Sequence, residues 1–343
     1  MKPIRIILKQ TFAITLFACI SSNSIAFDYW QSLPDKPIIP KNNPQDAKKI
    51  LLGKKIFFDK RISKNKNTSC NDCHNLTSGG DDNGKLTKNP SNPRQRSAPS
   101  LWNVAYMSTY YWDSRAKSLE QQFHMHLFND GILGKYSETE LIQKISDLPG
   151  YDQLFAETFN DKKINSTNIS KALANFIRTL IVADSRADQY IKGNKLALNE
   201  KEERGYFAFQ EQGCLSCHFG VNFAGPAPGP ALKMGDGFYE LFPTIRGTEY
   251  EDEKYGFLID KGRFHFTKEV DHKLMWRVPS LRNIADSSPY FHNGKIESLH
   301  DAVRIMNRVQ FNYPINEETI DDIVAFLKTL SGQYPKINQP NYE

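Results

Sequence analysis

The spacing of apolar and polar residues along the chain predicts helices far more often than strands. Apolar side chains recur every three to four positions at Ile169, Leu173, Phe176 and Leu180, which predicts an amphipathic helix over residues 168–181. Similar patterns with start or stop signals predict further helices over residues 45–58, 118–128, 137–147, 199–213, 298–309 and 317–330. Because strand patterns are sparse, the sequence predicts a mostly α-helical fold.

Local signals sharpen the ends of some of these helices. Ser137 is followed three positions later by Glu140, which is the pattern of a capping box. Asn199 and Glu202 repeat this spacing at another helix start. The stretches 75–99 and 219–260 are rich in Gly and Pro, so we expect irregular structure there.

The N-terminus has the composition of a secretory signal peptide. Basic residues from Lys2 to Lys9 precede an apolar stretch over residues 12–20, and Ser24-Ile25-Ala26 is a small-x-small cleavage site. The apolar stretch is too short for a permanent transmembrane helix. We therefore expect cleavage after Ala26 and export to the periplasm. A lipoprotein anchor at Cys19 is the weaker alternative, because the preceding Phe17 is bulky for such a site.

The charge of the chain gives no reason to expect a nucleic-acid partner. The whole sequence has a formal charge of +5, and loss of the three basic and no acidic residues in 1–26 leaves +2. No dense stripe of Lys and Arg is present.

The cysteines are the most informative residues. The segments 70–74 (CNDCH) and 214–218 (CLSCH) are both C-x-x-C-H, the attachment motif of c-type haem. Two thiols three positions apart can form thioethers with the two vinyl groups of one porphyrin, and the adjacent His74 or His218 then lies under the iron. A disulfide, a redox pair or half of a zinc site is each less suitable, because none requires His after both motifs. The cofactor set predicted from Cys70, Cys73, Cys214 and Cys217 is two covalently bound haem c groups.

One motif in each half of the chain predicts two related domains. We expect a signal peptide at 1–26, an N-terminal haem domain at 27–185, a C-terminal haem domain at 186–332 and a tail at 333–343. A haem iron either gains a sixth ligand or keeps an open position. His/Met ligation suits electron transfer, and an open iron can bind peroxide. Six other histidines and several methionines leave the sixth ligands undecided by composition.

Longer motifs resemble those of the bacterial di-haem cytochrome c peroxidase family, in the same order along the chain. They are residues 52–59 (LGKKIFFD), 69–74 (SCNDCH), 111–116 (YWDSRA), 278–283 (VPSLRN) and 289–294 (PYFHNG). The resemblance covers nearly the whole chain after the signal peptide, and it implies two cytochrome c-like domains, each binding one haem. Related enzymes that mature methylamine dehydrogenase belong to the same group.

The resemblance implies a role for several residues. His218 would be the proximal ligand of the electron-accepting C-terminal haem, and Met306, in the stretch 302–306 (AVRIM), would be its sixth ligand. Trp112 would relay electrons between the haems, and His74 would hold the N-terminal, peroxide-reducing haem. Without the resemblance, Met306 could fill a gap in the core and Trp112 could simply pack there.

The chain departs from the family pattern at two catalytic positions. The family's loop His, which caps the oxidised N-terminal haem, has no counterpart, since residues 75–123 contain no His. Lys85, Lys88 or a tyrosine could substitute. The family's distal Glu is replaced by Ile132, which cannot move protons. His124 and His126 lie upstream on a predicted helix, and at most one of them can face the haem, because positions two apart point to different sides. Both could equally be ordinary surface histidines.

The resemblance also implies a calcium site between the domains. Ser97 stands where Asn is typical, whereas Ser287 and Pro289 could still offer oxygen ligands. Calcium is therefore left open as a cofactor.

Three functions remain in competition. The first is reduction of hydrogen peroxide with electrons from a small donor such as a cytochrome c or a cupredoxin. The second is peroxide-dependent oxidation of a protein partner's aromatic residues, as in the maturation branch; Met306 argues against it because that branch typically has Tyr there. The third is a non-enzymatic electron carrier. Family members are often homodimers, so we expect one here.

Overall fold

The protein is described by a computed structural model that is mostly helical, as predicted. The structure describes residues 30–84, 96–129, 133, 134, 136–225, 238–245 and 254–342. The signal peptide, Cys19, Lys85, Lys88 and Ile132 lie outside the described residues. Within the described part of the chain, no helix is both long and apolar enough to cross a lipid bilayer.

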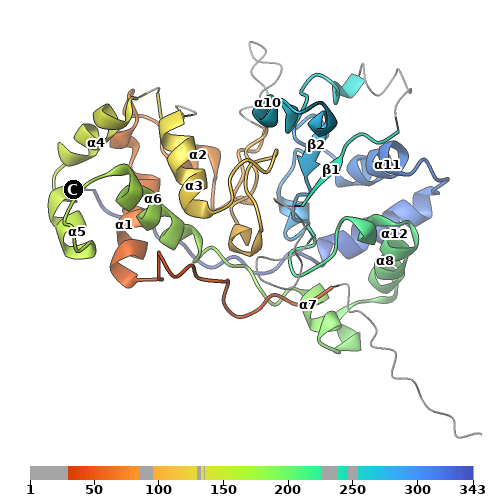
Figure 1. Ribbon diagram of the computed structural model, residues 1–343. Coiled ribbons are helices and arrows are strands. Elements are labelled where there is room, and N and C mark those ends of the chain that lie inside the picture. The colour runs from red at the N-terminus through yellow and green to blue at the C-terminus, as the bar shows by residue number, and fades with distance from the viewer. Residues whose placement is uncertain are drawn as a thin grey trace, which may run out of the picture.

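The helices gather in two lobes (Figure 1). The N-terminal lobe contains α1 (Ala47–Phe58), α2 (Cys70–Cys73), α3 (Leu119–His124), α4 (Glu138–Ser146), α5 (Tyr151–Thr158) and α6 (Ser166–Ile177). The C-terminal lobe contains α7 (Arg186–Ile191), α8 (Glu200–Glu211), α10 (Phe264–Thr267), α11 (Leu299–Gln310) and α12 (Glu317–Lys328). It also holds the antiparallel pair β1 (Tyr239–Leu241) and β2 (Met275–Arg277), in which Glu240 lies opposite Trp276.

Short helical turns connect these elements. A π-helical turn, Met125–Asn129, continues α3. The 3-10 turns are Lys60–Ile62, Val104–Tyr106, Lys195–Ala197, Cys214–Ser216, Val270–His272 and Ile284–Asp286.

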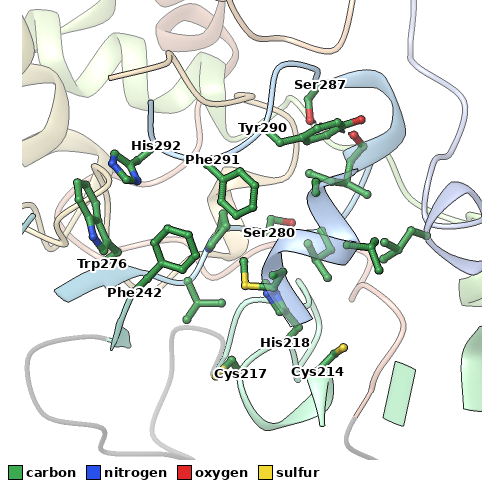
Figure 2. A pocket seen from close by; sticks show the side chains of 18 of the residues that line it. Cys214, Cys217, His218, Phe242, Trp276, Ser280, Ser287, Tyr290, Phe291 and His292 are labelled. Carbon is green, nitrogen blue, oxygen red and sulfur yellow. Dashed lines mark hydrogen bonds between the residues drawn. The ribbon is translucent and has the colours of Figure 1, made fainter. Parts of the chain in front are cut away.

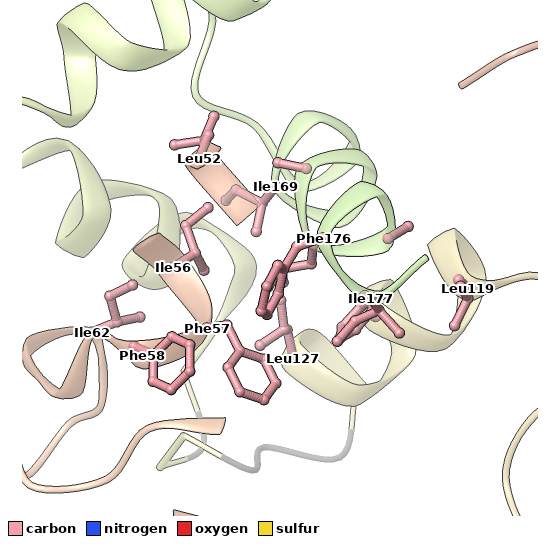
Figure 3. Packing of buried hydrophobic residues seen from close by; sticks show 14 of the residues in the cluster. Leu52, Ile56, Phe57, Phe58, Ile62, Leu119, Leu127, Ile169, Phe176 and Ile177 are labelled. Atoms are coloured by element: carbon pink, nitrogen blue, oxygen red, sulfur yellow. The ribbon is translucent and has the colours of Figure 1, made fainter. Parts of the chain in front are cut away.

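Each lobe is organised around one pair of closely packed helices. In the N-terminal lobe α1 crosses α6, and the rings of Phe57 and Phe176 meet edge to face with centroids 5.3 Å apart (Figure 3). A Cβ at Gly53 would lie 2.0 Å from the carbonyl oxygen of Ala172, so only glycine allows this approach. In the C-terminal lobe α8 crosses α12 in the same way, and a Cβ at Gly205 would lie 1.8 Å from a main-chain oxygen of α12.

The predicted helix starts are confirmed where capping residues defined them. Ser137 and Glu140 form both bonds of a capping box at α4, as do Asn199 and Glu202 at α8. The helices α5 and α7 were missed by the sequence pattern. Both are short, and α7 lies in the segment expected to join the domains, where its stability depends on packing against α12 rather than on periodicity.

The two lobes are tied together by contacts between distant segments. Arg263 of the C-terminal lobe donates from Nη1 to the carbonyl oxygen of Asp113 in the N-terminal lobe at 2.8 Å. Within the C-terminal lobe, Arg282 forms a buried ion pair with Asp188 of α7, with Nη1 2.9 Å from Oδ2. The tail after α12 runs back over the N-terminal lobe (Figure 1). There the ring of Tyr334 lies 5.1 Å from that of Trp102, and the Tyr342 hydroxyl donates to the carbonyl oxygen of Lys55. The tail is therefore part of the folded structure.

Candidate haem sites and the cavity between the lobes

The histidines of the two C-x-x-C-H motifs have the same local arrangement. His74 Nδ1 lies 3.1 Å from the carbonyl oxygen of Pro99, and His218 Nδ1 lies 2.9 Å from that of Phe223. A carbonyl can only accept, so Nδ1 carries the proton and Nε2 keeps a free lone pair. Burial lowers the pKa of each histidine to about 4, so both are neutral at physiological pH. This is the tautomer and charge state that an iron ligand requires.

Among the residues that the structure describes, none of Cys70, Cys73, Cys214 and Cys217 forms a disulfide. Burial raises the pKa of Cys70 and of Cys214 to about 12, so these thiols stay protonated. A site that binds a metal through thiolates would lower the pKa of its cysteines, whereas apolar surroundings suit a porphyrin edge. The setting of the motifs fits thioether attachment better than a zinc site.

The second motif opens into a cavity of about 460 Å³ (Figure 2). Cys214, Cys217 and His218 lie on its wall, and Met306 of α11 also lines it. Leu299, Ala302 and Val303 of the same helix line the cavity too, as expected from their shared helical face. The structure therefore brings Met306 and His218, far apart in the sequence, to one largely apolar cavity that fits a haem.

Trp112 comes from the N-terminal lobe but lines this same cavity. Its indole Nε1 donates to the carbonyl oxygen of Ser97 at 2.8 Å, and its own carbonyl accepts from the main-chain N–H of Arg277 at 2.8 Å. The ring packs against the aromatic cluster of the C-terminal lobe, which includes Trp276 and Phe257. Trp112 is thus held at the contact between the lobes by both of them.

The first motif has a different neighbourhood. His126 lies on the π-helical turn after α3, close enough to His74 that its charge contributes, after burial, to the lowered pKa of His74. The ring of His126 is 6.1 Å from that of Tyr111. His124 instead packs its ring 5.2 Å from that of Phe128. The charge of His126 thus acts on the first motif, and π-turns such as the one that carries it are frequent at functional sites.

The sequence pattern missed a group of buried polar residues at the contact between the lobes. Arg96 forms ion pairs with Asp113 at 2.7 Å and with Asp260 at 2.8 Å. Arg277 and His292 are buried on the cavity wall. The sequence offered one signal for two of these residues: Arg277 directly precedes the motif 278–283, and His292 lies within the motif 289–294.

The three residues of the expected calcium site line the same cavity. They are Ser97, Ser287 and Pro289, and Asp81 lies on the wall with them. Asp81 Oδ1 is buried without a hydrogen-bond partner, and burial, together with the charge of Asp82, raises the pKa of Asp81 to about 7. No cluster of three or more His, Cys, Asp or Glu with the geometry of a metal site occurs among the residues that the structure describes.

Comparison with known proteins places these sites in a family. Residues 47–196 match the family described as di-haem cytochrome c peroxidase. The chain is 31% identical to cytochrome c551 peroxidase of Pseudomonas aeruginosa, over 96% of this chain and 92% of that protein. It is 32% identical to cytochrome c551 peroxidase of Nitrosomonas europaea, over 97% and 95%. The chain belongs to the di-haem cytochrome c peroxidase family, as its motifs predicted.

Two further similarities complete this picture. The methylamine utilization protein MauG of Methylophilus methylotrophus is 26% identical over 90% of this chain and 89% of that protein. Among solved structures, a MauG-like protein associated with microbial copper homeostasis superposes with a TM-score of 0.69 at 23% identity, over 88% of this chain and 95% of that one. The diheme peroxidase BthA of Burkholderia thailandensis gives 0.64 at 22% identity, over 84% and 87%. These structures share the fold.

Proposed function

We propose that this protein reduces hydrogen peroxide to water with electrons from a small cytochrome c or cupredoxin. The C-terminal haem would accept the electrons, and the N-terminal haem would be the site of peroxide reduction. One observation carries this direction: the cavity of the second motif is lined by His218, by Met306 and by Trp112 of the other lobe. His/Met ligation raises the reduction potential, which suits the electron-accepting site.

The residues of the chain divide the work as follows. Cys70, Cys73, Cys214 and Cys217 would attach two haem c groups through thioethers, with His74 and His218 as proximal ligands. When bound, the haems supply the redox chemistry in which peroxide takes up two electrons and two protons to give two molecules of water. Trp112 is held by the main chains of Ser97 and Arg277 and would relay electrons between the two sites.

His126 is the group that we assign to proton transfer. Ile132 of the chain cannot act as the distal acid–base group, and His126 is near enough for its charge to act on His74 of the first motif. Its imidazole would take a proton from one peroxide oxygen and return it to the other as the O–O bond breaks. General acid–base catalysis of this kind typically contributes about 10²–10⁴-fold to a rate.

Other expectations remain proposals of the same kind. Export through residues 1–26 would place the enzyme in the periplasm, where haem attachment occurs. We propose the division into domains 27–185 and 186–332, which the two groups of helices in Figure 1 support. Calcium could be held by the carbonyl and hydroxyl oxygens of Ser97, Ser287 and Pro289, with Asp81 supplying charge. A homodimer is the expected assembly.

The absence of the distal Glu and of any His in 75–123 favours one second candidate. The protein would then use peroxide to oxidise aromatic residues of a protein partner, as the maturation enzymes do. Met306 in the cavity argues against this function, because that branch typically has Tyr at the position.

One experiment separates these functions. The optical and EPR spectra of the oxidised two-haem protein are recorded, and peroxide is added with and without reduced cytochrome c. One high-spin and one low-spin haem with fast donor oxidation is the expected result. A long-lived high-valent state without donor turnover would favour the second candidate. Two low-spin haems inert to peroxide would indicate an electron carrier and contradict both enzymatic functions.

A further inference from the structure

Two aromatic rings on the cavity wall have nitrogen atoms without partners. Trp276 Nε1 and His292 Nε2 are both buried and form no hydrogen bond with any residue that the structure describes. The two residues are 5% and 4% exposed, and their rings stack with centroids 3.9 Å apart and planes 18° apart. The guanidinium of Arg96 lies 4.9 Å from the Trp276 ring, which helps to hold it in place. A buried polar atom without a hydrogen bond is destabilising, so two such nitrogens side by side are rare unless a ligand supplies the partner.

Arg277, next to Trp276 on β2, is a buried cation without a carboxylate partner. Its Nε donates to the carbonyl oxygen of Tyr111 at 2.9 Å, and its Nη1 donates to its neighbour Val278 at 3.3 Å. Its Nη1 also lies 3.9 Å from the sulfur of Met107. In the part of the chain that the structure describes, no carboxylate lies within ion-pair distance of Arg277. Burial lowers the pKa of Arg277 to about 10, which shows how poorly its charge is compensated.

Other arginines near the cavity differ from Arg277 in this respect. Arg282 lines the same cavity and is neutralised by Asp188 at 2.9 Å. Arg96 binds both Asp113 and Asp260. Asp113 is close enough to favour the charged form of Arg277, but it is already engaged by Arg96. A buried ion that lacks its partner is strongly destabilising, so an anion from outside the polypeptide is expected beside Arg277.

The position of these residues identifies the anion. Figure 2 shows Trp276 and His292 at one end of the cavity and Cys214 and Cys217 away from them. In a c-type haem the cysteines hold the vinyl edge, and the two propionates project from the opposite edge of the porphyrin. A haem attached at Cys214 and Cys217 would therefore turn its propionates away from the cysteines, in the direction of β2.

We propose that Arg277, Trp276 and His292 form the site that binds a propionate of the C-terminal haem. Arg277 supplies the opposite charge, and the two ring N–H groups supply hydrogen bonds to the carboxylate. This inference rests on the proposed function, because it requires the haem at the second motif. Since the same arginine holds Tyr111 and Trp112 through the main chain, the site would also join the propionate edge of this haem to the proposed electron relay.

The proposal predicts the reduction potential of the C-terminal haem. Ferric haem carries one more positive charge than ferrous haem, so a nearby cation disfavours the ferric form. Arg277→Gln should lower the midpoint potential by the equivalent of about tenfold in the electron-transfer equilibrium, which is about 59 mV for one electron. Arg277→Lys keeps the charge and should remain close to the wild type. Trp276→Phe removes only the N–H group and should give a smaller shift in the same direction.

The test uses the purified two-haem protein without peroxide. Spectroelectrochemical titration gives the potential, and the propionate bending band in the resonance Raman spectrum reports hydrogen bonding at the carboxylate. Arg204→Gln is the matched control, because Arg204 pairs with Asp322 on the surface of the helix pair α8 and α12. The Raman band should change in Arg277→Gln and Trp276→Phe and stay unchanged in the control.

Two results would overturn the proposal. The first is an unchanged reduction potential and an unchanged Raman band in Arg277→Gln. The second is an equal shift of the potential in Arg277→Gln and Arg277→Lys, which would mean that the charge of Arg277 has no effect on the haem. Should Arg277→Gln fail to retain its haems, the band in Trp276→Phe decides in the same way. A protein that holds both haems and lacks peroxidase activity would contradict the proposed function alone.

Discussion

The two lobes use the same attachment motif and the same helix-pair scaffold, yet their histidines have different neighbours. His218 lies on a large apolar cavity that Met306 also lines. His74 has His126 nearby, a titratable group on a π-helical turn. Attachment is therefore a local property of five residues, whereas the reactivity of each iron would depend on what the rest of the lobe brings to its other face.

The largest expected effect concerns the N-terminal site. His126→Ala should lower the rate of peroxide reduction about 10²–10⁴-fold, because the proton relay would be lost. The reaction is followed as oxidation of reduced cytochrome c in stopped flow. The matched control is His124→Ala, on the neighbouring turn with its ring against Phe128, which should change the rate less than about twofold. Equal rates in the two variants would remove His126 from the mechanism.

The next largest effect is expected from removing the proposed sixth ligand of the C-terminal haem, which would leave both haem irons with an open position. Met306→Leu removes the proposed sixth ligand of the C-terminal haem, so its low-spin EPR signal should disappear and its potential should fall. We expect donor-driven turnover to drop about tenfold or more, since a lower potential weakens electron uptake from the donor. Met275→Leu, on β2 and outside the cavity lining, is the control. If the low-spin signal survives in Met306→Leu, the sixth ligand is another residue.

The shared scaffold can be tested in one lobe at a time. Gly53→Ala would place a methyl group 2.0 Å from the Ala172 oxygen, and forcing α1 away from α6 should cost about 1–3 kcal/mol of unfolding free energy. Chemical denaturation monitored by circular dichroism measures the change. Leu51→Ala, at an exposed position of the same helix, should stay within about 0.5 kcal/mol of the wild type. If the Gly53→Ala protein has the same free energy of unfolding as the wild type, α1 and α6 can move apart without loss of stability.

The smallest effect near neutral pH concerns the buried ion pair of Asp188 and Arg282 within the C-terminal lobe. Burial alone would raise the pKa of Asp188, but hydrogen bonds and the charge of Arg282 outweigh it, so the pKa of Asp188 is lowered. A lowered pKa in the folded state stabilises the protein above the unfolded pKa of about 3.9, and this contribution is lost as the pH falls through the folded value. The contribution of Asp188 to thermal stability should therefore stay constant between about pH 6 and 8 and should be lost in acid. Asp188→Asn should remove that part of the acid dependence, and an unaltered acid profile would contradict the assignment.

Much of the fold was predictable because it is local. Helix periodicity and the capping residues at Ser137 and Asn199 gave correct helices, since they depend on neighbours within one turn. The short α5 and α7 were not predictable, because short helices are stabilised mainly by what they pack against. The candidate site was predictable where motifs are contiguous, as in the two C-x-x-C-H segments.

The sequence alone determined the mostly helical class, the two attachment motifs and the family, because each depends on residues a few positions apart. Only the tertiary structure decided that the charge of His126 acts on His74, that Met306 shares a cavity with His218, and that no described carboxylate pairs with Arg277. These facts depend on how segments more than a hundred residues apart pack together, and packing sets burial, charge compensation and reach, which no local pattern records.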